Sequence, residues 1–267
     1  MIDERNKKII WQHINSSKER NKILTEEIVA METINMKNQK INCAILKYGG
    51  VRILIPASEL NHEQKNNKLI VRNMIGSKVR FVVVEIEKEY EKAVASRVKA
   101  LELIKEFNFK RYEVGDVIDV DIVEVHKKYI VIECLGVDIS IKAKDLEFGF
   151  VEDATKLYKK NQKIKVLIKE IGSEGKDIKV SIKELLTDPF MDIRKNFVEN
   201  GEYKARVTGY AENGLYTNIA QGVDSLTTLP NNLDIPPLPG DEIVIKINKI
   251  IPEKRKIYST YIDLSKR

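Results

Sequence analysis

Residues 48–60 read YGGVRILIPASEL, with a Gly-Val step at Gly50 inside a run of apolar and β-branched residues. The same step returns twice, in CLGVDISIKAKDL at 134–146 and in AQGVDSLTTL at 220–229. The three glycines of these steps are separated by 86 residues in both intervals. A glycine between two β-rich runs indicates two strands joined by a turn. The chain therefore contains three copies of one β-rich module.

Two more landmarks recur in each copy. One is a run of alternating apolar and polar residues, the pattern of a half-buried strand. Its apolar members are Val79, Phe81, Val83 and Ile86, then Ile164, Val166, Ile168 and Ile171, then Ile243, Ile245, Ile247 and Ile250. The other is a small hydroxyl residue in a closing strand ten positions further on, namely Ser96, Ser181 or Thr260. One more β-like run precedes each Gly-Val step, so every copy has five strands.

Five short antiparallel strands with a longer link between the third and fourth are typical of an OB-fold barrel. We therefore predict an all-β fold of three tandem five-stranded OB-fold barrels, joined by short helical linkers and preceded by an N-terminal helix. The predicted boundaries are 1–20 for the helix, 21–97 for the first barrel, 98–110 for a helical linker, 111–184 for the second barrel, 185–198 for a linker and 199–265 for the third barrel. The apolar side of the N-terminal helix, with Ile9, Ile10, Trp11 and Ile14, fits either packing on the first barrel or contact with a partner.

The charge of the chain is unevenly distributed. The 267 residues have a net charge of +6, and residues 1–110 hold 21 Lys and Arg against 14 Asp and Glu, whereas residues 111–267 hold 25 against 26. A polyanion should therefore be attracted most strongly to the first module, because neutralised phosphates supply much of the sequence-independent affinity for nucleic acid. The alternative is a solvated surface of mixed charge.

The composition argues against a membrane protein, and the residue pattern argues against an enzyme. No run approaches ~18 apolar residues, and the N-terminus lacks the apolar segment of a signal peptide, so we expect a cytoplasmic protein. Cys43 and Cys134 each lie in an apolar β-like run, where a buried thiol is expected. His13, His62 and His126 lie far apart, without the spacing of metal ligands or of a triad. We therefore expect no catalytic residues, no metal and no cofactor.

The order of these motifs resembles an RNA-binding family, the S-one domain, named after ribosomal small-subunit protein one. Residues 50–60, GVRILIPASEL, followed by Ala-Ser-Arg at 95–97 and a helix, are similar to the second-type repeat of that protein in Gram-positive bacteria. Residues 180–190 and 252–257 resemble the ends of its next two repeats. The resemblance spans about residues 20–265. It implies OB-fold barrels that bind single-stranded RNA.

The resemblance also implies a set of RNA contacts. The family uses two aromatic residues flanking a glycine on the second strand, a histidine at the end of the third, and a basic residue in the last hairpin. The matching positions are Asn213, Gly214, Tyr216, Thr228 and Arg255 in the third copy, Lys128, Tyr129, Lys142 and Lys176 in the second, and Asn42, Cys43, Pro56 and Lys92 in the first, with Arg52 as a further contact. No copy keeps the full set. Because stacking of a base is worth about 1–3 kcal/mol, these losses predict weak, salt-sensitive binding.

Several of these residues keep a second interpretation. Tyr129 and Tyr216 are either stacking residues or exposed tyrosines without a special role. Lys142 and Arg255 are either phosphate contacts or ordinary surface charges. Tyr210 is expected in the core because of its place in the first strand of its copy.

Two functions fit the sequence. The leading hypothesis is a non-enzymatic RNA-binding protein of bacterial or phage origin, acting in translation or RNA handling through weak multivalent contacts with single-stranded RNA. The ribosome or another RNA-associated protein is an additional candidate partner, and no membrane or small-molecule substrate is expected. The alternative is a set of degenerate repeats that dock on the ribosome, RNA polymerase or a phage or mobile-element assembly. An enzyme is disfavoured because three repeats and their linkers leave no room for a catalytic domain.

Overall fold

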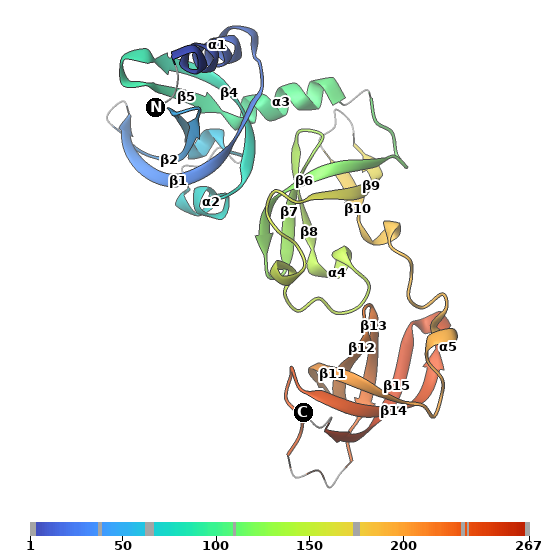
Figure 1. Ribbon diagram of the computed structural model, residues 1–267. Coiled ribbons are helices and arrows are strands. Elements are labelled where there is room, and N and C mark those ends of the chain that lie inside the picture. Colours follow the sequence, from blue (N-terminus) through green and yellow to red (C-terminus); the bar gives the residue numbers. More distant parts are fainter. Residues whose placement is uncertain are drawn as a thin grey trace. The chain divides into compact units, whose positions relative to one another are not determined.

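The computed structural model describes residues 4–36, 39–61, 67–108, 111–172, 177–230, 233 and 235–264 (Figure 1). The chain divides into two compact units, unit 1 with residues 1–141 and 155–180, and unit 2 with residues 142–154 and 181–267. Within the described ranges, no helix is long and apolar enough to cross a membrane.

The first barrel of unit 1 is closed, with strand order β1-β2-β3-β5-β4. Its strands are β1 (Leu24–Met36), β2 (Gln39–Tyr48), β3 (Val51–Pro56), β4 (Lys78–Glu87) and β5 (Lys92–Ser96), with the turns η1 (Ala57–Glu59) and η2 (Lys88–Tyr90) and the helix α2 (Lys68–Asn73) between them. The closing pair β3 and β5 is parallel. The expectation of antiparallel strands throughout is therefore wrong at this pair, because five strands cannot alternate in direction all the way around a closed ring.

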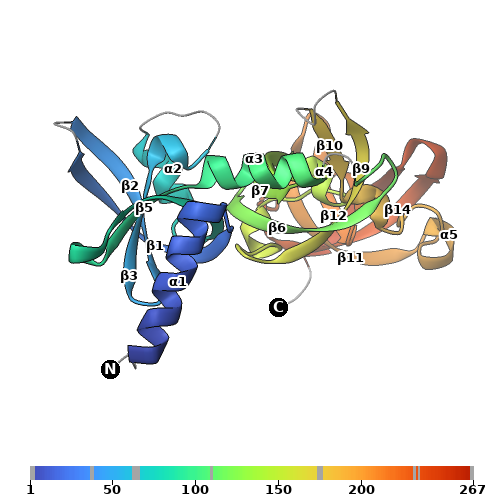
Figure 2. The same ribbon diagram turned by 90° about the horizontal axis from the view of Figure 1, so that it is seen from above.

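The core of the first barrel is continuous and apolar. The inward residues of its strands form one cluster that also includes Val71 of α2 and Ile14 of the N-terminal helix α1 (Glu4–Arg20). Ser17 of α1 is buried as well, and its Oγ accepts a hydrogen bond of 2.9 Å from the backbone N–H of Val83. The helix therefore packs on the first barrel, as Figure 2 shows. This decides between the two interpretations of its apolar side.

The second five-stranded sheet of unit 1 has the order β10-β9-β6-β7-β8, which is the same succession of strands opened between its third and fifth members. Its strands are β6 (Val117–His126), β7 (Tyr129–Cys134), β8 (Val137–Lys142), β9 (Lys163–Ile171) and β10 (Ile178–Ser181), with the turn η3 (Ala154–Lys156) before β9. Cys134, like Cys43 in the first barrel, is fully buried, and burial raises the pKa of both thiols, that of Cys134 to about 12. The expectation of buried cysteines is confirmed.

An ionic cluster joins the first and second barrels within unit 1. Arg97, at the start of α3 (Arg97–Asn108), is 0% exposed. Its guanidinium donates hydrogen bonds of 2.7 Å to both carboxylate oxygens of Asp138, and one of 3.0 Å each to Glu133 and to the carbonyl oxygen of Leu60. Arg80 of β4 pairs with the same Glu133. A charge buried this deeply is tolerated only when it is paired and hydrogen-bonded, so the cluster fixes the two barrels to each other.

Unit 2 contains the third barrel, which is closed in the order β11-β12-β13-β15-β14. Its strands are β11 (Glu202–Ala211), β12 (Gly214–Ala220), β13 (Val223–Thr228), β14 (Glu242–Ile251) and β15 (Lys256–Leu264), and the short helical segments of the unit are α4 (Ala143–Leu146), η5 (Lys183–Leu185), α5 (Ile193–Asn196) and η6 (Pro252–Lys254). The closing pair β13 and β15 is again parallel. The predicted fold class, all-β with five-stranded OB-type barrels, is confirmed.

The core of the third barrel combines two apolar clusters with a set of buried hydroxyl groups. Its buried apolar residues form two separate clusters, one around Ile250 and one around Val207. Four further inward side chains are buried and polar, namely Thr217, Ser225, Thr227 and Ser259. They form a chain of hydrogen bonds of 2.6 to 2.8 Å, from Thr217 to Thr227 to Ser259 to Ser225. Each of these buried hydroxyls therefore has a hydrogen-bond partner inside the barrel.

The turn between the second and third strands of each module is packed by the segment that precedes the module. A Cβ on Gly136 would lie 2.7 Å from the backbone nitrogen of Lys105 in α3. A Cβ on Gly222 would lie 2.9 Å from the Cγ of Pro189, in the linker that precedes the third module. In the first module the glycine one position before the Gly-Val step, Gly49, lies against Ile10 of α1. Gly136 and Gly222 thus allow a close approach of backbone and neighbour, in addition to a positive φ.

Candidate nucleic-acid interface

The outer face of the third barrel is open, and it brings together several of the predicted residues. Along β12 the buried residues Leu215 and Thr217 alternate with Tyr216, whose side chain is 51% exposed. Because successive residues of a strand point to opposite faces, Tyr216 projects outward. On β13 the same alternation turns Leu226 and Thr228 outward.

Cross-strand register places these outward residues in two rows. Tyr216 pairs with Leu226, Leu226 with Tyr258, and Tyr258 with Lys249. The neighbouring row runs from Thr228 to Thr260 and then to Lys246. We name the surface formed by Tyr216, Leu226, Thr228, Lys246, Lys249, Tyr258 and Thr260 the barrel-three platform. It combines two aromatic rings, an aliphatic side chain between them, two hydroxyls and two amines at its β14 edge.

Glycines keep the platform accessible beside Tyr216. Gly209 of β11 pairs with Tyr216, and a Cβ at this position would meet no atom within 4 Å. Gly214 precedes Tyr216 by two residues with φ of +149°, and a Cβ there would collide with the carbonyl oxygen of Thr227. The predicted Gly214, Tyr216 and Thr228 therefore do lie together. An aromatic ring next to open backbone can accept a flat base on its face.

Arg255 does not join this platform. It ends the turn η6 with φ of +51° and pairs with Asp188. Its guanidinium also lies over the rings of Phe148 and Phe190, 4.7 and 4.8 Å from their centroids. A guanidinium held by a carboxylate and two rings is part of the packing of unit 2.

The second barrel presents less of its outer face. Tyr129, at the start of β7, stacks on His126 with ring centroids 4.3 Å apart, and Lys128 is exposed in the turn before it. Glu133 lies four residues further along the same strand, hence on the same face, and there it binds Arg97 and Arg80. The joint with the first barrel thus covers part of this surface. Lys142 is exposed at the end of β8, and Lys176 lies outside the described residues.

Ion pairs close the outer face of the first barrel. Cys43 and Leu54 are buried there in a small apolar cluster. Arg52 of β3 pairs with Glu32 of β1, so its side chain crosses β2 next to Cys43, the residue in register with Glu32. Lys92 Nζ lies 3.2 Å from a carboxylate oxygen of Glu87. Both predicted cations of this barrel are therefore already engaged within the barrel.

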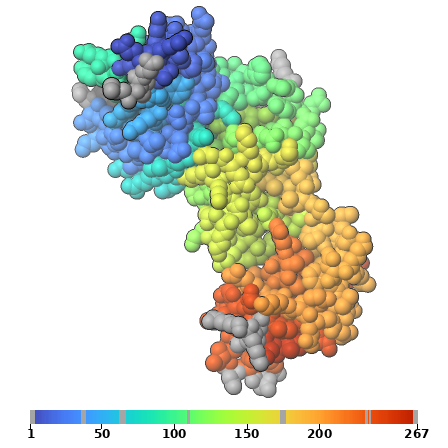
Figure 3. All heavy atoms as spheres, viewed as in Figure 1, coloured from blue at the N-terminus to red at the C-terminus, as the bar shows by residue number. Residues whose placement is uncertain are grey.

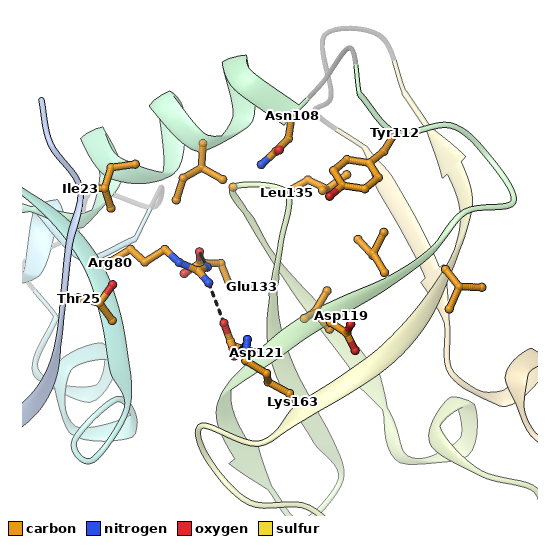
Figure 4. Close-up of a pocket in the computed structure, with 15 residues that line it drawn as sticks. Ile23, Thr25, Arg80, Asn108, Tyr112, Asp119, Asp121, Glu133, Leu135 and Lys163 are labelled. Carbon is orange, nitrogen blue, oxygen red and sulfur yellow. Dashed lines mark hydrogen bonds and ion pairs between the residues drawn. The ribbon is translucent and has the colours of Figure 1, made fainter.

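A cavity of about 580 Å³ lies in unit 1 between the first and second barrels (Figure 4). Arg80, Asp121, Glu133 and Lys163 line it with Tyr112 and Asn108 above them, as Figure 4 shows. Arg80 binds both carboxylates, and Lys163 Nζ lies 3.1 Å from Asp121. These charges neutralise one another, so the cavity offers no excess positive charge to a phosphate. Among the described residues, no group of three or more His, Cys, Asp or Glu could hold a metal ion.

Comparison with known proteins shows two kinds of relative. The chain is 28% identical over 195 residues to small ribosomal subunit protein bS1 of Staphylococcus aureus, covering 68% of this chain and 49% of the ribosomal protein. This similarity supports the interpretation of the three modules as S-one-like tandem domains. The chain is also 26% identical over 230 residues to 4-hydroxy-3-methylbut-2-enyl diphosphate reductase of Clostridium acetobutylicum, covering 80% of this chain and 35% of the reductase. It thus spans about half the length of the ribosomal protein and about a third of the reductase.

Other comparisons are more distant. No protein-family model matches the chain. A solved structure from Streptococcus pneumoniae, described as a multidomain protein with nucleic acid binding domains, is 12% identical, covers 94% of this chain and 76% of its own, and has a TM-score of 0.22.

Sequence reasoning about the S-one-type domains missed part of the platform. Leu226, Tyr258, Lys246 and Lys249 were not among the predicted contacts, although strict alternation along residues 257–260 indicates that Tyr258 and Thr260 share a face. Tyr210 was expected in the core, and this is wrong, since its side chain is 55% exposed. It pairs with Leu215 but lies one residue from the end of β11, beyond the strands that would cover it.

Proposed function

We propose that the chain is a non-enzymatic protein that binds single-stranded RNA, with the barrel-three platform as its main site for stacking bases. The observation that carries this proposal is the row of Tyr216, Leu226 and Tyr258 on the outer face of the barrel, where Tyr216 is exposed and the other two are half-buried. Stacking on a ring is tolerant of sequence because every base has a π-face. Lys246 and Lys249 at one edge supply charge for phosphates.

Similarity to a ribosomal protein supports RNA as the ligand class, and the tandem arrangement of S-one-type domains supports weak contacts that act together. The remaining predicted contacts of the second module then add secondary contacts, from the exposed Lys128 and Lys142 and from the half-buried Tyr129. We place the function in translation or RNA handling within the cytoplasm. The catalytic activity named for the clostridial reductase is not part of the proposal, because the similarity covers only 35% of that protein.

A labelled unstructured RNA of about twelve nucleotides tests the proposal by fluorescence anisotropy at ~50 mM salt. The wild-type protein should bind at micromolar concentration and release the RNA as salt rises. Tyr216→Ala should weaken binding by about 1–3 kcal/mol, the usual worth of one stacked base. Tyr210→Ala is the matched control, since it removes an equally exposed tyrosine of the same barrel that does not belong to the platform. No binding by the wild-type protein, or equal losses in both variants, would contradict the proposal.

A protein-docking role is a second candidate. The closed face of the first barrel, where Arg52 and Lys92 are paired internally, favours it for that barrel. Affinity capture from bacterial extract with and without nuclease separates the two roles, because a partner held through RNA is lost after digestion whereas a directly docked protein is retained.

A further inference from the structure

The first barrel carries a groove that the S-one-type contact pattern does not include. It has a volume of about 540 Å³ and is lined by Lys7, Lys8, Trp11 and Gln12 of α1 and by Lys88 of η2. Figure 3 shows the residues of α1, in dark blue, at the surface of the molecule. Trp11 is the single tryptophan of the chain.

The charge of the groove is positive. Its charged lining residues are Lys7, Lys8 and Lys88 against one carboxylate, that of Glu4. Lys7 pairs with Glu91. In the part of the chain that the structure describes, the exposed Lys8 and Lys88 form no ion pair. Two amines from different elements thus face the same opening outside any ion pair, and the groove keeps an excess of positive charge, which attracts a polyanion.

Trp11 supplies a flat surface in the same groove. Its side chain is half-buried, packed on one side against the apolar core of the first barrel. The ring is therefore held in place by that core, while the rest of it lines the groove. Gln12 and Asn15 also line the groove, and their amides can both donate and accept hydrogen bonds. An aromatic face with amines and amides around it matches a nucleotide with an unstacked base.

We propose that this α1 groove is a second RNA site, in which one base stacks on Trp11 and the adjoining phosphates lie at Lys8 and Lys88. The proposal rests on the proposed function for its ligand class, and it adds a site in unit 1 to the platform in unit 2. Single-stranded RNA fits better than duplex, because a paired base cannot present its face to the ring. An acidic peptide would meet the lysines but has no flat group for Trp11.

The single tryptophan makes the site directly observable. Tetrauridylate, which is too short to engage several modules, is titrated into the full chain at low salt while Trp11 emission is followed. We expect saturable quenching, as a stacked base quenches the indole. In Lys8→Ala/Lys88→Ala the affinity should fall about tenfold, and the slope of log affinity against log salt should decrease by about 2, one for each phosphate that no longer has a lysine beside it. Both lysines are exposed, so this variant keeps the fold.

The matched control is Lys254→Ala/Lys256→Ala, which removes the same two charges from the corresponding hairpin of the third barrel. Its quenching curve should match that of the wild type. Glu4→Gln removes the single acid of the groove and should tighten binding. Trp11→Phe, followed by anisotropy of labelled tetrauridylate, should weaken binding while thermal unfolding stays close to that of the wild type.

Several results would overturn the α1 groove as an RNA site. One is unchanged Trp11 emission under conditions where the twelve-nucleotide RNA binds and Tyr216→Ala weakens it, which leaves the platform intact. Another is an equal effect of the two double-lysine variants. A third is equal quenching by polyglutamate of the same charge, which would show attraction of anions without stacking. Failure of every RNA to bind would remove the proposed function as well.

Discussion

The first barrel encloses one continuous apolar core, whereas the third barrel has two apolar clusters and a chain of buried hydroxyl groups. The outer faces of the two barrels differ in the opposite sense, since charged groups lie on the first and aromatic rings on the third. Arg52 and Lys92 close the face of the first barrel through internal ion pairs, while Tyr216 and Tyr258 leave an aromatic surface open on the third. The same strand order therefore supports two different roles, a scaffold that joins its neighbour and a surface available to a ligand.

Among the substitutions that test this contrast, loss of the ionic cluster around Arg97 should lower protein stability the most. Arg97→Ala leaves the half-buried Asp138 without its partner and the buried Glu133 with Arg80 alone, and breaking such a buried pair costs about 3–5 kcal/mol. Burial alone would lower the pKa of Arg97, but Asp138 and then Glu133 raise it above its ordinary value. Both cysteines lie in unit 1, so the denaturant dependence of thiol labelling reports the unfolding of this unit.

The control for this variant is Lys204→Ala, which breaks the exposed pair with Glu242 in unit 2 and should leave thiol labelling unchanged. If Arg97→Ala also leaves it unchanged, the joint does not hold the scaffold together, and the contrast between the two barrels loses its basis.

The hydroxyl chain offers a smaller effect confined to unit 2. Thr227→Val keeps the shape of the side chain but leaves Thr217 and Ser259 each without one partner, which should destabilise the third barrel by about 1–3 kcal/mol. Replacing all four hydroxyl residues by Val or Ala removes every unsatisfied group and should cost less than the single change. Hydrogen exchange of the β12 and β13 amides measures the stability of the third barrel in the single and in the quadruple variant. A quadruple variant less stable than Thr227→Val would show that the hydroxyls themselves stabilise this core.

Opening the closed face should have the smallest effect. Arg52→Ala removes a half-exposed ion pair, worth about 0–1 kcal/mol. It also uncovers Cys43, whose pKa is raised mainly by burial, so labelling of this thiol should become faster while that of Cys134 stays slow. Peptide mass spectrometry distinguishes the two sites. RNA affinity should be almost unchanged, and a loss as large as that of Tyr216→Ala would move the main site to the first barrel.

Most of the fold could be predicted because its signals are local. Period-two runs such as Val79 to Ile86 and the glycine turns depend on residues close in sequence, and they indicate the strands and their order. The parallel pairs β3–β5 and β13–β15 were missed because they arise only when an odd number of strands closes into a ring, and local sequence patterns do not show this closure. The Arg97 joint was missed because its partners come from another module, although a glutamate inside the apolar run of β7 was a visible signal.

The site was predicted less completely, for a related reason. Gly214, Tyr216 and Thr228 were found together because strand alternation and turn position suffice to place them. Tyr258 was missed because it joins Tyr216 only through register across two strands. Arg255 was expected to be available for a phosphate, and its contacts with Phe148 and Asp188 depend on segments 67 residues or more away in the chain.

The packing of each glycine turn by the preceding segment changes what counts as one repeat. Gly136 lies against α3 and Gly222 against Pro189 of the linker, so a barrel excised at its first strand would lose the cover of its own turn. One structural repeat is then a barrel together with the stretch before it. A fragment for separate study of the second barrel should accordingly begin at Arg97 and not at its first strand. This also explains why the repeat length of 86 residues exceeds that of five strands and their turns.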